Sequence, residues 1–187
     1  MTKFNRCGPN PSLHADFPRA GAAPAAAGRR LACFVRPHVL PHPAIKLRAP
    51  TMADASLFYR VIDETMRGLI IATWGAWDET RVRREAAEFA KSASGQVIEV
   101  ADLAAGILVV DRAPGQIWLR QIYVLPENQR KGVGTFLVKQ LLAEGSRANV
   151  PIRLRVIALN PALSFYGRLG FVVTETTPDL VHLQHAA

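Results

Sequence analysis

Residues 128–135 read NQRKGVGT and lie between the apolar run QIYVLP, residues 121–126, and the stretch FLVKQLLAEG, residues 136–145. The apolar residues of the last stretch recur every three or four positions, which is typical of an amphipathic helix. The first N–H groups of a helix have no partner within it and lie at the positive end of its dipole. Glycine allows close backbone approach because it carries no Cβ. A strand that becomes a helix at Gly132 and Gly134 therefore predicts a phosphate site.

Two well-known phosphate loops do not fit this junction. A Walker loop needs Gly-Lys-Ser/Thr at the start of the helix, whereas Gly134 is followed by Thr135 and Phe136. A dinucleotide-binding fingerprint needs a third glycine where this chain has Leu137. A pyrophosphate cradle of another type remains. For the two glycines alone, a helix start that binds no ligand is an equally fair interpretation.

The bulk composition is that of one soluble globular domain. The chain has 187 residues, of which 49% are hydrophobic and 20% charged, and no apolar run approaches the ~18 residues that span a membrane. Its two cysteines, Cys7 and Cys33, are too few for a disulfide framework or a zinc site. We therefore expect a reducing, cytoplasmic location, with no metal and no membrane contact.

The first 43 residues differ from the rest of the chain. They hold six Lys/Arg, one acid and seven of the 13 prolines, with no helical or strand periodicity. This composition predicts a disordered extension. A transit peptide is an alternative that the prolines disfavour, and a start codon placed too far upstream is at least as good an explanation. The body, residues 44–187, has 17 Lys/Arg and 14 acids without a basic stripe, so nucleic acid is not an expected partner.

From residue 44 onward the pattern predicts one mixed α/β domain. Thr51 and Asp54 form a variant of the capping box before the first helix. The predicted strands are 44–48, 96–100, 106–110, 117–125, 152–158, 171–176 and 180–184. The predicted helices are 53–66, 78–92, 132–148 and 161–169, and either Asp78 or Thr80 can cap the second of them. The order β-α-α-β-β-β-α-β-α-β-β, with a meander in the middle, predicts a mostly antiparallel central sheet with flanking helices.

Two motifs in this order resemble a known family. The spacing Gln129-x-x-Gly132-x-Gly134 after IYVLP resembles the acetyl-CoA pyrophosphate loop of the GNAT superfamily of N-acetyltransferases. About 25 residues later, NPALSFYGRLGF, residues 160–171, resembles the second signature of the superfamily. The resemblance covers the chain from about Ile45 to its end. It implies a central sheet splayed into a V, with acetyl-CoA in the opening.

The resemblance also implies which residues bind this co-substrate. Backbone groups of Ile122, Tyr123 and Val124 would pair with the pantetheine arm as an added strand does. Asn160 would meet pantetheine or the acetyl-bearing end, and Phe165 would line the wall, with a plain core role as an equal alternative. The backbone amides of the loop would hold the pyrophosphate. The residues of this loop are Gln129, Arg130, Lys131, Gly132, Val133, Gly134 and Thr135.

The implied reaction is direct transfer of an acetyl group from sulfur to an amine, which needs no enzyme nucleophile. Tyr166 occupies the general-acid position of the superfamily, and a phenol of pKa ~10 can protonate a departing thiolate. The alternative is a tyrosine that packs the helix with its hydroxyl in solvent. A backbone N–H near Val124 is the expected oxyanion donor.

The acceptor site is expected where the first two helices meet. Trp74 and Trp77 are candidates for an aromatic wall, or for two residues that fasten the helices to the core. Asp78, Glu79, Glu99 and Tyr123 are candidates for contact with the amine or its proton. Some bacterial members of the superfamily carry a similar Trp-Gly-Trp-Asp-Glu segment.

The sequence thus predicts an acetyl-CoA-dependent N-acetyltransferase that acts on a primary amine of a small molecule or a protein. The alternative is a non-catalytic, regulatory module that binds coenzyme A. The sequence identifies neither the acceptor nor the general base, and it leaves open whether the protein forms a homodimer.

Overall fold

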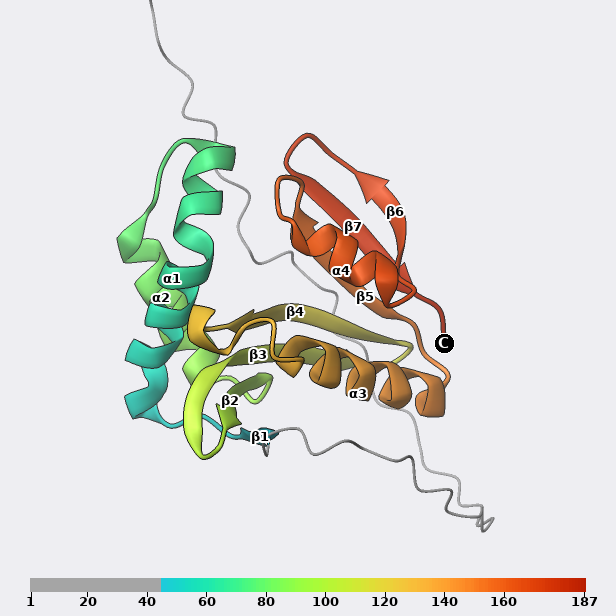
Figure 1. Cartoon of the computed structure of the whole chain (residues 1–187), viewed down its shortest axis with the longest axis horizontal. Coiled ribbons are helices and arrows are strands. Elements are labelled where there is room, and N and C mark those ends of the chain that lie inside the picture. Colours follow the sequence, from blue (N-terminus) through green and yellow to red (C-terminus); the bar gives the residue numbers. More distant parts are fainter. Residues whose placement is uncertain (1–44) are drawn as a thin grey trace, which may run out of the picture. The chain divides into compact units, whose positions relative to one another are not determined.

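The computed structural model describes residues 45–187, so the predictions for residues 1–43 lie outside the described part of the chain. The predicted order of helices and strands is confirmed (Figure 1). The strands are β1 Ile45–Arg48, β2 Gly95–Val100, β3 Leu103–Ala113, β4 Gln116–Val124, β5 Ile152–Ile157, β6 Val172–Thr176 and β7 Leu180–His185. The helices are α1 Ala55–Trp74, α2 Glu79–Lys91, α3 Val133–Ala148 and α4 Ala162–Arg168, with short 3-10 turns η1 Met52–Asp54 and η2 Pro126–Asn128.

The seven strands form one mixed sheet in the order β1-β2-β3-β4-β5-β7-β6. Strands β1 to β4 pair antiparallel as a meander, and β5, β7 and β6 pair antiparallel as well. Only β4 and β5 run parallel, because the chain crosses over through α3 between them. The predicted fold class, a mostly antiparallel central sheet with flanking helices, is confirmed.

The sheet has a hydrophobic cluster on each face. Residues of α1 and α2 pack with Val97, Ile107 and Val109 on one face. Residues of α3 and α4 pack with Leu108, Leu154 and other strand residues on the opposite face. This arrangement follows from the alternation of apolar residues along the strands, since neighbouring side chains point to opposite faces. None of the helices in residues 45–187 is both long and apolar enough to cross a bilayer.

The first helix is longer than the sequence predicted. It continues beyond Met66 to Trp74, because apolar residues such as Leu69 and Ile70 still pack on the core. It ends at Gly75, whose φ of 81° is left-handed, as is common just after a helix. Asp78, one of the two predicted caps, begins α2, and its carboxylate accepts a hydrogen bond from the Arg81 N–H at 2.9 Å.

Candidate functional site

Strands β4 and β5 pair over only part of their length. Their partnered residues run from Ile117 with Ile152 to Leu119 with Leu154. Beyond this point β4 continues to Val124 and β5 continues to Ile157 without pairing to each other. The two strands therefore leave an opening, bounded by residues 120–124 and 155–157.

A β-bulge lies at the start of this opening. Val109 pairs with Gln121, whereas its neighbour Val110 pairs with Leu119, so β4 carries one extra residue at Arg120. A bulge reverses the face to which the following side chains point. Leu119 packs in the core under α3, and beyond the bulge so do Ile122 and Val124.

The bulge also decides which backbone groups face the opening. The Leu125 N–H donates to the Ala105 carbonyl of β3 at 2.8 Å, and successive residues of a strand direct their N–H and C=O to opposite sides. Ile122 and Val124 therefore direct their backbone N–H and C=O groups to the unpaired edge of β4. A Cβ placed on Gly106 would lie 2.2 Å from the Tyr123 carbonyl oxygen, so this carbonyl points to β3.

The unpaired edge of β4 leads directly to the start of α3. Gly132, with a φ of 84°, precedes the helix, and none of the described side chains caps the helix start. Arg130 is also left-handed, with a φ of 58°. Such a turn makes successive N–H groups converge, which suits an anion. The Gln129 side chain donates to the Val124 carbonyl at 2.8 Å and so holds the loop against the strand.

The second motif packs against the first. A Cβ on Gly134 would lie 3.7 Å from the Phe165 ring, which places α4 beside the start of α3. The Asn160 side chain accepts a hydrogen bond from the Ala162 N–H at 2.9 Å and thereby begins α4. The structure thus brings both predicted motifs to the same opening.

Tyr166 is buried beside this opening. It packs edge-on to Phe165 and Phe171, with ring centroids 5.1 and 5.5 Å apart. Burial raises the pKa of Tyr166 above its usual value, and the neighbouring Tyr123 raises it further. A protonated phenol is therefore held next to the gap between β4 and β5.

Tyr123 approaches from the other face of the sheet. Its side chain packs on the cluster under α1 and α2. Burial raises the pKa of Tyr123 to about 12, Arg155 opposes the shift, and Glu85 adds to it. At neutral pH this phenol keeps its proton.

The acceptor candidates separate into two groups. Trp74, Trp77, Asp78 and Glu79 lie together at the connection between α1 and α2. The Trp74 indole N–H donates to the Asp179 carboxylate at 3.0 Å, which links α1 to the β6–β7 turn. The Arg67 guanidinium lies 5.0 Å from the centre of the Trp77 ring.

The two acidic candidates at Glu79 and Glu99 are both in ion pairs. Glu79 contacts Arg83 at 2.7 Å, and this guanidinium lowers the pKa of its carboxyl. Glu99 lies on β2 and contacts Arg48 of β1 at 2.8 Å. Strand β3 separates β2 from β4. The structure therefore does not bring Glu99 to the opening.

Three further polar residues lie near the opening, and two of them, Gln121 and Arg155, escaped the sequence reasoning. Gln121 is 5% exposed, and its Oε1 is buried with no hydrogen-bond partner among residues 45–187. Glu85 is buried on α2 in an ion pair with Arg81 at 2.8 Å. Burial lowers the pKa of Arg155, Arg120 lowers it further, and Tyr123 and Glu85 raise it. The alternation in IRLRVI, residues 152–157, was the available signal for a charged face on β5.

Comparisons with known proteins agree with this geometry. Residues 87–173 match the family model of the acetyltransferase (GNAT) domain. A comparison with curated proteins finds no match.

Solved structures share the fold. PaiA N-acetyltransferase of Thermoplasma acidophilum, in complex with coenzyme A, superposes with a TM-score of 0.62 at 16% identity, over 77% of this chain and 99% of that one. The ribosomal-protein-S18-alanine N-acetyltransferase of Escherichia coli superposes with a TM-score of 0.57 at 18% identity, over 76% of this chain and 94% of that one. YncA of Salmonella typhimurium, described as a putative acetyltransferase with its cofactor acetyl-CoA, superposes with a TM-score of 0.54 at 19% identity, over 76% of this chain and 94% of that one. Residues 87–173 are therefore similar to the GNAT acetyltransferase domain, and the described part of the chain shares its fold with solved acetyltransferases.

Proposed function

We propose that the protein transfers an acetyl group from acetyl-CoA directly to a primary amine of a small molecule or a protein. One observation carries the proposal: the unpaired edge of β4 leads without interruption to the uncapped start of α3. An extended chain with amides and a diphosphate at one end has the chemistry that this edge and this helix start accept. Two of the similar structures contain coenzyme A or acetyl-CoA.

The residues of the opening divide the binding between them. Backbone groups of Ile122 and Val124 pair with the pantetheine amides, and the free N–H groups near Gly132 and Gly134 hold the pyrophosphate. Arg130 and Lys131, both exposed, add positive charge near this anion. The Val124 carbonyl already accepts from Gln129, so its N–H remains for the substrate. The thioester then lies near Tyr166.

The transfer needs a neutral amine. The amine nitrogen attacks the thioester carbonyl, the Val124 N–H donates to the oxygen that becomes negative, and the carbon–sulfur bond breaks. The Tyr166 hydroxyl gives its proton to the thiolate. The amine loses a proton to water, and the tyrosinate regains one from solvent. Tyr123, whose pKa is about 12, is protonated at neutral pH and is a poor candidate for the base.

A non-catalytic module that binds coenzyme A is the second candidate. The observation in its favour is the packing of Tyr166 between Phe165 and Phe171, which a purely structural tyrosine would also show. Release of free thiol from acetyl-CoA that depends on an added amine separates the two functions.

The test uses calorimetry with coenzyme A and thiol release with a panel of primary amines. The variant Gly134→Glu adds bulk and a negative charge where the pyrophosphate is expected, so it should abolish binding. The control is Gly68→Glu on α1, where a Cβ meets no atom within 4 Å, and it should bind as the unmodified protein does. Equal binding by both variants, or no binding by the unmodified protein, would contradict the proposal.

A further inference from the structure

Strand β5 directs two arginines to the face opposite α3 and α4. Leu154 and Val156 belong to the hydrophobic cluster under these helices. Because side chains alternate along a strand, Arg153 and Arg155 point to the other face. This is the face that α1 and α2 cover over β2, β3 and β4.

The strand register places other functional side chains beside these arginines. Trp118 of β4 and Gln184 of β7 are the cross-strand neighbours of Arg153. His182 of β7 is the neighbour of Arg155. The two rows therefore run across β4, β5 and β7 on one face, with an indole, two guanidinium groups and an imidazole.

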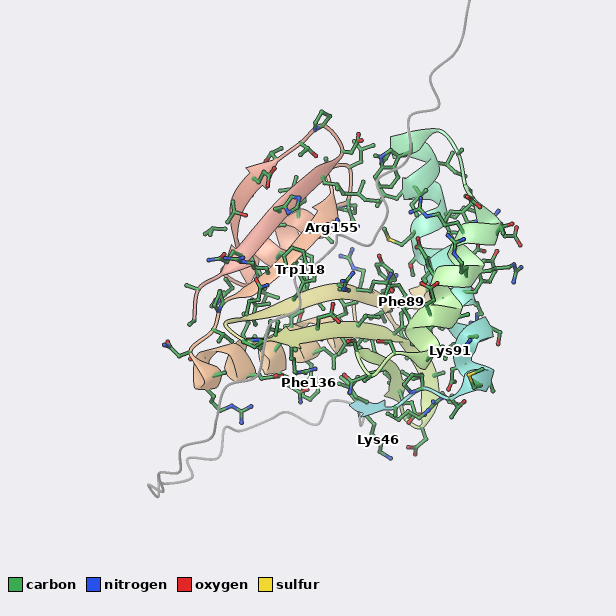
Figure 2. All side chains as sticks on the ribbon, turned by 180° about the vertical axis from the view of Figure 1, so that it is seen from behind. Lys46, Phe89, Lys91, Trp118, Phe136 and Arg155 are labelled. Carbon is green, nitrogen blue, oxygen red and sulfur yellow. The ribbon has the colours of Figure 1, made fainter. Side chains whose placement is uncertain are left out.

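On this face, Leu180 is the only described residue of β7 and β6 that packs in the cluster with α1 and α2. Figure 2 looks onto it, with Trp118 and Arg155 labelled and α1 and α2 to one side. A shallow hollow of about 230 Å³ lies there, with Trp118, Arg153, His182 and Glu175 among its lining residues. The face is open to a partner.

Arg153 presents a charge that no described carboxylate neutralises. Its guanidinium donates to the Gln184 side-chain oxygen at 2.8 Å and to the Gln116 side-chain oxygen at 3.0 Å. Two neutral acceptors on neighbouring strands hold the group in place without cancelling its charge. A charge held in this way loses little conformational entropy when it binds an anion.

The hollow and the opening between β4 and β5 are both bordered by strand β5. Arg153 lies beside the last paired residues of these strands, and Arg155 lies two residues further, at the opening itself. The distance between them is about 7 Å, or two residues of an extended strand. A molecule whose amine lies in the opening therefore reaches Arg153 with a group a few atoms away.

The length and charge of the face indicate what kind of molecule fits. From β4 to β6 it spans three strand intervals, or about 14 Å, which is longer than a single small amine. At the β6 end lie the Glu175 carboxylate and Val172, which is 62% exposed. A carboxylate repels a phosphate backbone, so an extended peptide suits this end better than a nucleic acid.

We propose that this face binds an acidic segment of a polypeptide acceptor, with a primary amine in the opening and carboxylates over Arg153. The inference rests on the proposed acetyl transfer and names its acceptor class. It makes Arg153 a specificity-determining residue that takes no part in the chemistry.

The first experiment compares acceptors of different charge. The peptides Ser-Glu-Glu-Ala-Gly-Tyr, Ser-Gln-Gln-Ala-Gly-Tyr and Ser-Lys-Lys-Ala-Gly-Tyr are tested with acetyl-CoA, and kcat/KM is measured for each. We expect the acidic peptide to be the best acceptor. Arg153→Glu should lower its kcat/KM about tenfold, because an attraction is lost and a repulsion of similar size is added. The neutral peptide should change little, and the control Arg147→Glu, on α3, should change neither.

The second experiment does not depend on turnover. Calorimetry measures binding of the acidic peptide with a blocked N-terminus, of the basic peptide and of single-stranded oligothymidine. Binding of the acidic peptide that Arg153→Glu abolishes and Arg147→Glu preserves supports the inference. Equal binding of all peptides, or binding of the oligonucleotide alone, overturns it. If all three peptides are acetylated at the same rate, the acetyl transfer is supported and the specificity for acidic peptides is not. If no amine releases thiol from acetyl-CoA, the proposed function is contradicted, and the peptide-binding measurement alone then tests the inference.

Discussion

Tyr166 and Tyr123 illustrate how one residue type takes different roles by position. Tyr166 comes from α4 on one face of the sheet and Tyr123 from β4 on the other, and Tyr123 is close enough to raise the pKa of Tyr166. Burial raises the pKa of both hydroxyls. A phenol that stays protonated at neutral pH can donate a proton to a leaving thiolate, and only Tyr166 belongs to the signature motif.

Replacement of Tyr166 by Phe should lower turnover about 10²-fold, the usual size of a general-acid contribution. The ring and its contacts with Phe165 and Phe171 remain, so the affinity for acetyl-CoA should stay nearly unchanged. Thiol release gives the rate, and calorimetry gives the affinity. Tyr59→Phe is the matched control, because the Tyr59 hydroxyl contacts Asp63 on α1, at 3.5 Å. Equal rates in the unmodified protein and in Tyr166→Phe would show that another group protonates the sulfur.

At the scale of elements, a buried carboxylate fastens the first strand to the first helix. Asp54 accepts hydrogen bonds from two guanidinium nitrogens of Arg48, each at 2.8 Å, and from the Thr51 N–H at 2.7 Å. Arg48 also contacts Glu99 on β2. Arg48 first, and then Thr51, hold the pKa of the Asp54 carboxyl well below its usual range. The predicted pairing of Thr51 with Asp54 is thus part of a larger network.

Replacement of Asp54 by Asn should lower the free energy of unfolding by about 1 to 2 kcal/mol at pH 7, since the partly exposed Arg48 is screened by solvent. A depressed pKa in the folded state stabilises the protein above about pH 4, the unfolded value, and this stabilisation is lost as the pH falls through the folded value. The difference between the two proteins should therefore shrink below pH 4. Urea unfolding at several pH values measures it. Asp102→Asn, which removes an exposed partner of Lys46, is the control for the loss of a surface ion pair.

Across the whole domain, hydrogen bonds link the end of α1 with the β6–β7 turn and with the end of β5. Trp74 at the end of α1 donates to Asp179 in the β6–β7 turn, and these residues are 105 positions apart. The Asp179 carbonyl also accepts from the Ala158 N–H, just after β5, at 2.8 Å. This turn therefore connects α1, β5 and the closing hairpin.

A double-mutant cycle with Trp74→Phe and Asp179→Ala should show a coupling of about 1 kcal/mol in the free energy of unfolding, the usual net contribution of one hydrogen bond. Urea unfolding of the two single variants and the double variant provides the values. A cycle with Trp77→Phe in place of Trp74→Phe is the control. The Trp77 indole nitrogen is buried and has no hydrogen-bond partner in the described part of the chain, so the effect of Trp77→Phe should add to that of Asp179→Ala. Strict additivity in the Trp74 cycle would mean that the bond contributes nothing.

Local signals in the sequence determined the order of helices and strands, the glycine start of α3, the Asp78 cap and the position of Tyr166 in its motif. Each depends on residues a few positions apart, where periodicity and turn chemistry are informative. Only the tertiary structure decided that β4 and β5 separate after Leu119, that a bulge turns Tyr123 to the far face, and that Arg153 and Trp118 share a hollow. Those features depend on the pairing register of distant strands, and no local pattern specifies that register.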